Sequence, residues 1–168
     1  NFSLHKGEIF GVAGLVGAGR TETVRACFGL DDVEEGRIFI YGSDKTHSIP
    51  KKRLDDGVGF LSENRKEEGL MLNQNVAENL TTTNYYRFTR WGFIDKVKQH
   101  TSAKQIIDRL DIKIRELSQS VNELSGGNQQ KISLGRLLHH NAEIYILDEP
   151  TRGIDIASKS EIYKIMGE

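Results

Sequence analysis

A glycine-rich segment near the start of the chain limits the possible folds more than any other feature of the sequence. Residues 14–21 read GLVGAGRT and fit the phosphate-binding pattern G-x-x-x-x-G-K-S/T at every fixed position except Arg20, which stands where lysine is expected. The mostly apolar segment 8–13 predicts a buried strand that leads into the glycines, and residues 21–28 predict a helix that ends at Gly29. Strand, glycine loop and helix in this order indicate an α/β fold that binds phosphate.

The chemistry of the loop follows from its residue types. Its glycines let the backbone curl into a nest of N–H groups, and the helix that follows adds its positive end to a bound phosphate. Thr21 is placed to ligate Mg²⁺, while Arg20 keeps the positive charge of the usual lysine on a longer, planar and forked group. We therefore expect phosphate binding to survive and the position of this charge against a γ-phosphate to change, with Glu22 weakening the local field. Taken alone, the segment is equally compatible with a glycine turn that binds nothing.

A second group of residues lies far downstream. Residues 144–147 form a short apolar run typical of a fully buried parallel strand, and Asp148 and Glu149 follow it directly. Such strand ends lie at the carboxyl edge of the sheet, where ligands bind in α/β proteins. We expect Asp148 to hold Mg²⁺, directly or through water, and Glu149 to polarise an attacking water. A solvated strand end is the alternative, and the glycine loop upstream counts against it.

A third motif, LSGGNQQK at residues 124–131, opens a helix predicted over residues 126–140. Ser125, Gly126 and Gly127 would leave the first N–H groups of this helix and one hydroxyl available to an anion. The alternative is a simple N-cap by Ser125 with the glycines forming a turn, and that explanation suffices for the motif taken alone.

Periodicity divides the rest of the chain. Two short apolar runs, 37–41 and 58–61, predict further strands, and a last helix begins near Asp155. Between the strands the composition turns polar with helical spacing, which indicates a helical insertion. The predicted parts are a core α/β region with the phosphate-binding loop at 1–63, a helical subdomain at 64–123, and the motif helix, acidic strand and following helix of the core at 124–168. A sheet of this kind normally continues, so we expect C-terminal strands and some N-terminal sequence to lie outside these 168 residues.

Composition narrows the classes of partner. The net charge of −1 gives the chain no general attraction to nucleic acid or to an anionic membrane surface. Its two short basic runs, 51–53 and 65–66, have acidic neighbours and are typical of solvated faces. The single cysteine, Cys27, excludes an internal disulfide framework, and no run of about 18 apolar residues predicts a membrane span.

Together these motifs resemble those of an ATP-binding cassette (ABC) ATPase: phosphate loop, helical arm, signature, acidic strand and then TRGID at residues 151–155. The sequences of these motifs are most similar to those of the second, C-terminal and degenerate cassette of tandem ATP-binding proteins in bacterial monosaccharide importers of the ribose, galactose or xylose type. Residues 14–22, 63–70, 124–131 and 148–155 carry the resemblance, which extends over nearly the whole chain. It implies a P-loop NTPase fold with a mostly parallel core sheet, a small antiparallel β part and an inserted helical subdomain.

The resemblance also assigns roles to residues, with ATP and Mg²⁺ as the cofactors. Glu149 and Glu63 would be catalytic. The metal would be held by Thr21, Asp148 and Glu63. The nucleotide contacts would come from Gly14, Leu15, Val16, Gly17, Ala18, Gly19, Arg20, Thr21 and Glu22, and from Ser125, Gly126, Gly127, Asn128 and Gln129. Residues 153–155 would line the contact between two cassettes.

Four positions depart from the usual family pattern. Arg20 replaces the loop lysine, and Glu22 replaces a hydroxyl residue. Glu63 takes the place of the glutamine that senses Mg²⁺ and the transmembrane partner, and Asn128 that of the signature glutamine. The family's switch histidine would lie beyond Glu168. These changes imply that the site built on this loop binds nucleotide and turns over slowly or not at all.

In this family two cassettes pair head to tail, and each ATP lies between one phosphate loop and the other cassette's signature. The resemblance therefore implies the first cassette of the same polypeptide as a partner, with transmembrane permease subunits, indirectly a periplasmic sugar-binding protein, and no nucleic acid. The expected location is peripheral, at the cytoplasmic face of the bacterial inner membrane. Two alternatives stay open: a regulatory module that binds nucleotide without hydrolysis, and a soluble ABC protein that acts on nucleic acid or the ribosome.

Residues 84–93 form the most aromatic stretch of the chain and include Arg87 and Arg90. Such a mixture can stack on nucleic-acid bases, pack inside the helical arm, or belong to a docking surface for a permease loop. We favour packing for this stretch and extend the docking expectation to the arm as a whole.

Overall fold

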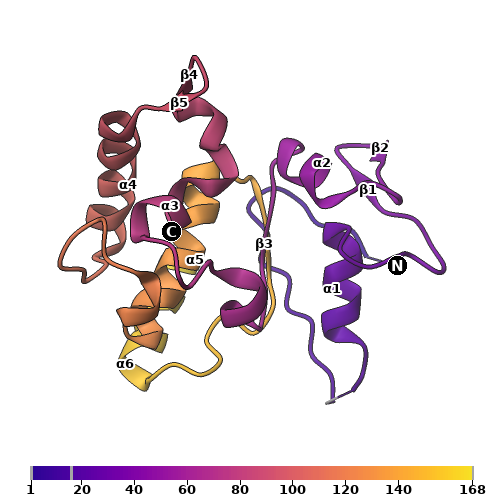
Figure 1. Cartoon of the computed structure of the whole chain (residues 1–168). Coiled ribbons are helices and arrows are strands. Elements are labelled where there is room, and N and C mark those ends of the chain that lie inside the picture. Colours follow the sequence, from indigo (N-terminus) through magenta and orange to yellow (C-terminus); the bar gives the residue numbers. More distant parts are fainter. Residues whose placement is uncertain (1, 16, 168) are drawn as a thin grey trace.

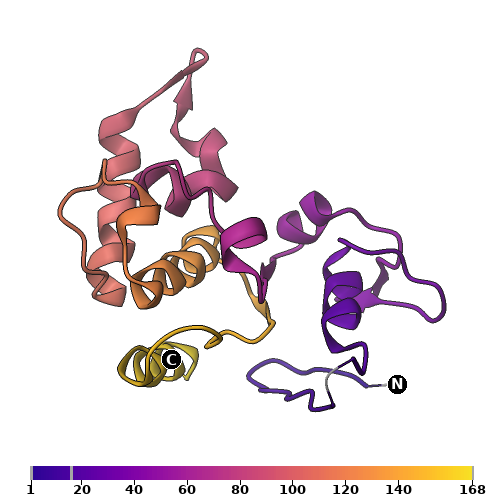
Figure 2. The ribbon, with the colours of Figure 1, turned by 60° about the horizontal axis from the view of Figure 1, so that its bottom comes forward.

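The computed structural model describes residues 2–15 and 17–167 and has an α/β fold. A short parallel sheet of β3 (Val58–Leu61) and β6 (Ile144–Leu147) lies between two parts of the chain. One part holds α1 (Arg20–Phe28), β1 (Phe39–Ile40), β2 (Ser43–Asp44) and α2 (Pro50–Asp55). The other holds α3 (Val76–Thr81), α4 (Lys96–Leu110) and α5 (Gly126–His140). Figure 1 and Figure 2 show these parts on opposite sides of β3 from two directions.

The two strands of the parallel sheet are the ones that the sequence predicts. Val58 lies opposite Ile144 and Leu61 opposite Leu147 in the register. The prediction of complete burial for residues 144–147 is wrong, since the Tyr145 side chain is 42% exposed. A strand is buried on both faces only where other layers cover both, and one face of β6 stays open at Tyr145.

The strand predicted for residues 8–13 does not form. The segment pairs with no other strand of the described residues, and Ile9 is 83% and Phe10 45% exposed. An apolar run becomes a strand only when a neighbour takes up its N–H and C=O groups. Within residues 2–15 and 17–167 the strand hydrogen-bonded to β6 is β3. Phe2 and Phe10 stack on each other instead, with ring centroids 4.9 Å apart.

The central helix of the second part, α5, packs on α3 and α4. The shared core is apolar and includes Val76, Leu80, Ile107, Leu110 and Ile132. Gly135 permits the close approach of the helices, because a Cβ there would lie 2.7 Å from Ile106 Cγ2 and 2.9 Å from Leu80 Cδ2. Asn75 and Glu78 start α3 with reciprocal side-chain and backbone hydrogen bonds, which form a capping box.

The segment predicted as a helical insertion also contains a β-hairpin of β4 (Thr89–Arg90) and β5 (Phe93–Ile94). Its two turn residues, Trp91 and Gly92, have φ angles of 54° and 81°, as tight hairpins require. Three further turns complete this region: η1, a π-helical turn at Arg65–Gly69, and two 3₁₀ helices, η2 at Thr82–Phe88 and η3 at Val121–Glu123. The part boundaries at 63/64 and 123/124 stay predictions.

The remaining predicted elements agree with the structure. α1 ends at Gly29, whose φ is 86°, and β1 pairs antiparallel with β2. α6 (Ile156–Met166) begins after Asp155, whose carboxylate accepts the Ser158 N–H at 3.0 Å, and packs against α5. Among residues 2–15 and 17–167, no helix is both long and apolar enough to cross a membrane.

Candidate functional site

The glycine loop enters α1 through two residues with positive φ, Gly17 at 81° and Gly19 at 77°. Glycine adopts this conformation without the steric cost that other residues meet, which accounts for both positions. Gly19 is also the N-cap of α1 and supplies no side chain to its first N–H groups, so these donors stay available to an anion. Gly14 and Leu15 are exposed, and Val16 lies outside the described residues.

The Arg20 guanidinium pairs with the carboxylate of Glu149: Nη1 lies 3.3 Å from Oε1. The residue that replaces the loop lysine therefore holds the side chain predicted to polarise water. Both side chains are partly exposed, at 34% and 45%. Glu149 has a φ of 45°, uncommon for a residue other than glycine. The pair joins the start of α1 to the end of β6 across 129 residues of sequence.

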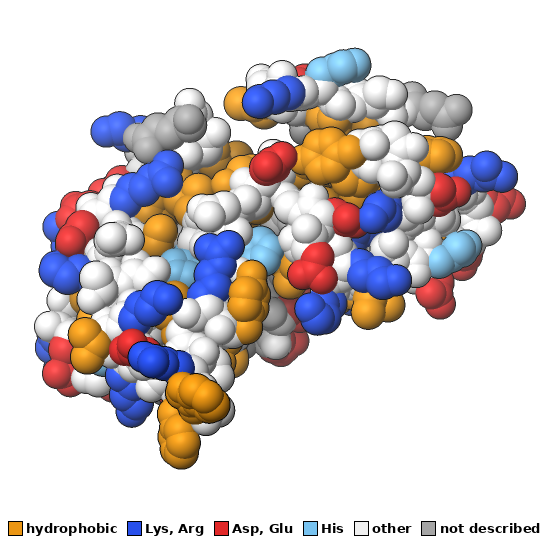
Figure 3. Space-filling view, turned by 90° about the horizontal axis from the view of Figure 1, so that it is seen from above, with side chains coloured by type: hydrophobic (Ala, Val, Ile, Leu, Met, Phe, Trp, Pro, Cys, Tyr) orange, Lys and Arg blue, Asp and Glu red, His pale blue; other side chains and the backbone are white. Residues whose placement is uncertain are grey.

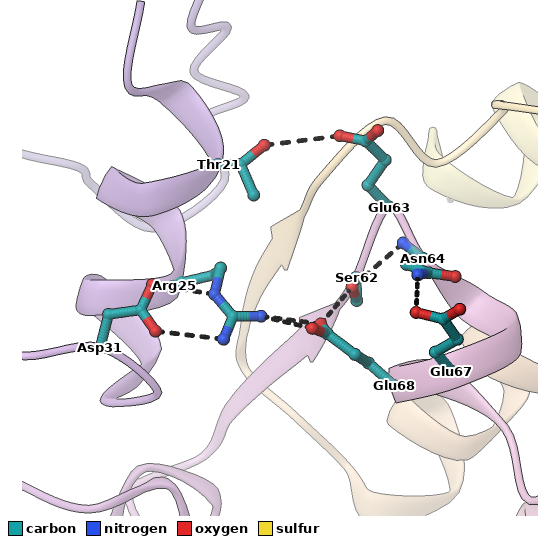
Figure 4. Close-up of polar contacts among 8 residues, drawn as sticks. All are labelled: Thr21, Arg25, Asp31, Ser62, Glu63, Asn64, Glu67 and Glu68. Carbon is teal, nitrogen blue, oxygen red and sulfur yellow. Dashed lines mark hydrogen bonds and ion pairs between the residues drawn. The ribbon is translucent and has the colours of Figure 1, made fainter. Parts of the chain in front are cut away.

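The side chains of Thr21 and Glu63 face each other, as Figure 4 shows. The Thr21 hydroxyl donates to Glu63 Oε2 at 3.5 Å. The other oxygen of the Glu63 carboxylate pairs with the guanidinium of Arg152. Glu63 is thus shared between the residue predicted to ligate Mg²⁺ and a cation from the loop after β6. Glu22, the next residue along α1, is exposed.

A second ionic network ties α1 to the segment after β3 (Figure 4). Arg25 donates to both Asp31 oxygens, at 2.8 and 3.1 Å, and its Nη1 lies 2.8 Å from Glu68. The hydrogen bonds with Asp31 raise the pKa of Arg25, and those with Arg25 lower the pKa of Asp31. The Ser62 hydroxyl also donates to Glu68, at 2.7 Å. These contacts hold α1 against the turn that carries Glu63.

Asp148 fits a bound cation. Its side chain is 8% exposed at the end of β6, and its Oδ2 has no hydrogen-bond partner among the described residues. Such an oxygen costs free energy unless water or a cation binds it. No three His, Cys, Asp or Glu side chains gather into a metal cluster within 2–15 and 17–167. Because Mg²⁺ is often held by one or two protein oxygens together with substrate phosphates, Asp148 and Thr21 suit Mg²⁺ that arrives with a nucleotide.

The signature motif caps α5. The Ser125 hydroxyl accepts the Asn128 N–H at 3.4 Å and the Asn128 side-chain amide at 3.1 Å. Asn128 Oδ1 accepts the Lys113 N–H at 2.9 Å, and the buried Gln129 amide donates to two backbone carbonyls at 3.2 Å. The Asn128 and Gln129 side chains therefore serve the local fold. Ser125 is the exposed residue of the five predicted to contact nucleotide in this motif.

Packing leaves little room beside both signature glycines, and least beside Gly127. A Cβ on Gly127 would lie 2.1 Å from Ser158 Oγ, and a Cβ on Gly126 would lie 3.0 Å from Arg65 Nη2. Figure 1 and Figure 2 place α1 and the start of α5 on opposite sides of β3. The loop and the signature of one chain therefore do not form a common site.

The structure thus brings part of the predicted site together. The residues joined by direct contacts are Arg20 with Glu149 and Thr21 with Glu63. Sequence analysis missed Arg152 and Arg65. Arg65 was predicted on a solvated face, and this is wrong, because it is half-buried and donates to the carbonyls of Arg152 and Gly153. Arg53, from the other basic run, is fully buried. Partners 87 and 88 residues from Arg65 leave no local signal.

The aromatic stretch 84–93 lies mostly at the surface. Phe88 is buried as predicted, at 4% exposure. The prediction of internal packing is wrong for Tyr86, Trp91 and Phe93, which are 69%, 89% and 80% exposed. The last two belong to the β4–β5 hairpin, which extends away from the helical core in Figure 1. Figure 3, which views the molecule from above, shows apolar side chains that project from its outline near basic ones.

The chain is similar to proteins of one family. The family model "ABC transporter" matches residues 1–152. The ribose import ATP-binding protein RbsA of Lactococcus lactis subsp. lactis is 44% identical over 168 residues, and a putative ribose/galactose/methyl galactoside import ATP-binding protein of Agrobacterium fabrum is 45% identical over 169 residues. Each comparison covers all of this chain, which spans 34% of the length of either relative.

Solved structures show the same fold. The ATP-binding cassette MJ0796, in a dimeric post-hydrolysis state bound to ADP and Pi, has a TM-score of 0.80 to this chain at 23% identity. The superposition covers 99% of this chain and 71% of that one. The fold is therefore that of a P-loop NTPase cassette, as predicted. With the family model and the relatives in agreement, the chain belongs to the ABC transporter family.

Proposed function

We propose that this chain is an ATP-binding cassette from the ATPase subunit of a bacterial sugar importer, and that it is the second cassette of a tandem polypeptide. The names of the relatives, which specify ribose or galactose import, support the substrate class. The altered loop at residues 14–22 supports the second position, because the degenerate cassette of such proteins has a similar loop.

The observation that carries the proposal is the 3.3 Å contact between Arg20 and Glu149. A general base must be able to accept a proton or orient water, and an arginine on its carboxylate competes with that role. The same contact draws the Arg20 charge away from a γ-phosphate. The nucleotide site built on this loop therefore binds ATP and hydrolyses it slowly or not at all.

Mg²⁺ would be held by Thr21 and Asp148, with Glu63 as a further carboxylate. The bound ion would neutralise charge on the phosphate oxygens of ATP. Glu63 already pairs with Arg152 and accepts from Thr21, so a metal at Thr21 would have to displace that hydrogen bond. This competition gives a second reason for slow turnover at this loop.

The signature of the chain serves the other site. Ser125 is exposed at the N-terminus of the 15-residue helix α5, where the helix dipole favours an anion. We assign this helix start, with the Ser125 hydroxyl and the backbone N–H groups of Gly126 and Gly127, to ATP bound on the phosphate loop of the first cassette. ATP would clamp the two cassettes together, and hydrolysis at the partner's loop would release them.

The closing cassettes would drive transmembrane permease subunits at the cytoplasmic face of the bacterial inner membrane. A periplasmic sugar-binding protein would deliver the solute to these subunits, and nucleic acid has no part in this function. The exposed side chains of Trp91 and Phe93 give the helical arm an apolar surface suited to a permease loop.

A second candidate function draws on the same Arg20 contact. A cassette whose base is occupied can act as a regulatory module that binds nucleotide without any hydrolysis. The two candidates differ in whether the signature of this chain is needed for turnover elsewhere.

ATP hydrolysis by the full-length protein, assembled with its permease, tests both. Ser125→Asp keeps a capping side chain but sets a negative charge where the partner's ATP would bind. Like charges in such a contact cost several kcal/mol, so we expect turnover to fall at least about a hundredfold. The matched control Ser125→Asn caps the helix without the charge and should stay within about threefold of the parent. Arg20→Ala should reduce turnover only a few-fold.

Two outcomes would contradict the proposal. Abolition of turnover by Arg20→Ala would show that the altered loop is itself the working site. Full turnover in Ser125→Asp would remove the signature from the mechanism and leave the regulatory module as the better description.

A further inference from the structure

Arg65 joins two segments that the chain keeps apart in sequence. It opens the π-helical turn η1, two residues after Glu63, and its side chain reaches the loop that follows β6. Nη1 donates to the Arg152 carbonyl at 2.8 Å, and Nη2 donates to the Gly153 carbonyl at 3.2 Å. The planar fork of arginine suits two neighbouring acceptors, and it fixes the orientation of the backbone that carries them.

The loop held by Arg65 also contacts the proposed nucleotide site. The Arg152 side chain pairs with Glu63, which accepts from Thr21. The Arg152 N–H donates to the Glu149 carbonyl at 2.9 Å. A continuous series of contacts therefore runs from the first turn of α1, through Glu63 and Arg152, to the backbone that Arg65 holds.

The same guanidinium lies against the start of the signature helix. A Cβ on Gly126 would lie 3.0 Å from Arg65 Nη2, so glycine at this position admits the arginine. The signature helix makes its own bond to this loop, in which Gln130 Nε2 donates to the Pro150 carbonyl at 2.6 Å. Gln130 thus bonds the loop at residues 150–153 to α5, and Arg65, which bonds the same loop, lies beside Gly126.

We propose that Arg65 is a positioning residue that couples the two nucleotide sites to which this chain contributes. Nucleotide and Mg²⁺ at Thr21 compete for Glu63 and so alter its pairing with Arg152. Because Arg65 holds the Arg152 carbonyl and lies beside Gly126, and Gln130 bonds the same loop to α5, that change reaches the signature offered to the partner cassette. The inference rests on the proposed function, since it needs two shared sites; the coupling itself is carried by contacts within this chain.

Substitutions of Arg65 in the full-length protein with its permease test the role. Arg65→Met removes both hydrogen bonds, and we expect kcat for ATP to fall about tenfold with KM changed less than about twofold. Arg65→Lys keeps the charge but replaces the planar fork with a single nitrogen, and it should lose about threefold in kcat. Lys66→Met is the matched control, because Lys66 is the exposed neighbour on the same turn, and its kcat should equal that of the parent.

A double-mutant cycle with Arg152 separates positioning from a merely structural role. Arg152→Ala breaks the pair with Glu63 but leaves the carbonyl that Arg65 binds, and Arg152 is 64% exposed, so the fold should tolerate the change. If Arg65 acts through this loop, Arg65→Met should lower kcat much less in the Arg152→Ala background than in the parent. A residue that only supports the fold would cause the same fold-loss in both backgrounds.

Either of two results overturns the inference: an unchanged kcat in both Arg65→Met and Arg65→Lys, or equal losses in the two Arg152 backgrounds. If Arg65→Met does not fold, Arg65→Lys carries the same cycle. Failure of the proposed function is recognised separately, because Ser125→Asp would then retain turnover. The inference fails alone when Ser125→Asp abolishes turnover and the Arg65 variants behave as the parent.

Discussion

One contact of Arg20 affects two functions of the proposed nucleotide site. A lysine at this position would place a compact ammonium at the phosphates, whereas the longer arginine fork reaches Glu149 at 3.3 Å. The pair is partly exposed, and such pairs are usually worth only about 0–1 kcal/mol. Bound nucleotide, which carries several negative charges, can therefore compete for Arg20. So weak a pair permits nucleotide binding, and it occupies the carboxylate proposed as the general base only while Arg20 stays on Glu149.

Gly127 gives a prediction that separates packing from nucleotide contact. A Cβ there would lie 2.1 Å from Ser158 Oγ and 2.7 Å from Ser158 Cβ, so α5 and α6 would have to move apart. We expect Gly127→Ala to lower the free energy of unfolding by about 1–3 kcal/mol, as overpacking usually does. Urea unfolding of the chain measures the change. Because any Gly127 variant disturbs the fold, Ser125 is the better position for testing the signature.

The control for this prediction removes the obstructing side chain. Ser158→Gly removes both of these atoms, Oγ and Cβ, and the next neighbour of the added methyl, Asp155 Oδ2 at 3.9 Å, is an ordinary contact, so the cost of Gly127→Ala should shrink markedly in that background. An undiminished cost in that background would show that the clash with Ser158 is not its cause.

α5 combines the signature at one end with a buried histidine near the other. His139 is 8% exposed, and its Nε2 lies 2.9 Å from the Ser102 hydroxyl of α4. Its Nδ1 has no partner among the described residues. Burial lowers the pKa of His139, and the positive charges of Arg87 and His140 lower it further. The contact between α4 and α5 is therefore built around a neutral imidazole.

This arrangement predicts a pH dependence of stability. Since the pKa of His139 is lower in the folded than in the unfolded chain, the unfolded state binds the proton more readily as the pH falls. The stabilising contribution is complete above the unfolded value of 6.5 and is lost as the pH falls from there through the folded pKa. In His139→Gln, the loss of stability between pH 7.5 and the acid side of the transition should be smaller. Urea midpoints of parent and variant across that pH range measure it, and identical slopes would contradict the assignment to His139.

Elements with strong local signals could be predicted from the sequence. α5 and α6 begin at the side chains Ser125 and Asp155, and their caps are formed as such residues form them. Whether residues 8–13 form a strand could not be predicted from local signals, because a strand needs a hydrogen-bonding neighbour elsewhere in the chain. The β4–β5 hairpin was missed because its turn is Trp91–Gly92, where asparagine or aspartate would have been the usual indication.

The candidate site was likewise predictable from the sequence only in part. The glycine conformations at Gly17 and Gly19 follow from a local motif, and the structure has them. The pairing of Arg20 with Glu149 and the two bonds of Arg65 connect residues more than 80 apart, and neither charge pattern nor periodicity indicates them. Long-range ion pairs depend on how the elements come together, so they become visible only in the folded chain.

In the molecule as a whole, apolar side chains are exposed to solvent around the parallel sheet of β3 and β6. Ile9, Val12 and Leu15 are 83%, 50% and 84% exposed on the segment before α1, and Tyr145 is 42% exposed on β6. An extended apolar segment and an incompletely paired strand are both surfaces on which polypeptide chains associate. The helical part of the chain therefore has a well-packed core, whereas the region around β3 and β6 exposes apolar surface that favours association.

This combination predicts self-association of the chain when it is expressed alone. We expect oligomers at micromolar concentration, with Val12→Lys weakening association about tenfold, because a buried valine contributes roughly 1.5 kcal/mol or more to a contact. Trp91→Lys is the control: it removes an even more exposed apolar side chain, on the hairpin away from the sheet, and should leave association unchanged. Sedimentation velocity over a concentration series distinguishes the outcomes. A chain that stays monomeric throughout, or an equal effect of both substitutions, would show that the chain does not associate through the region around β3 and β6.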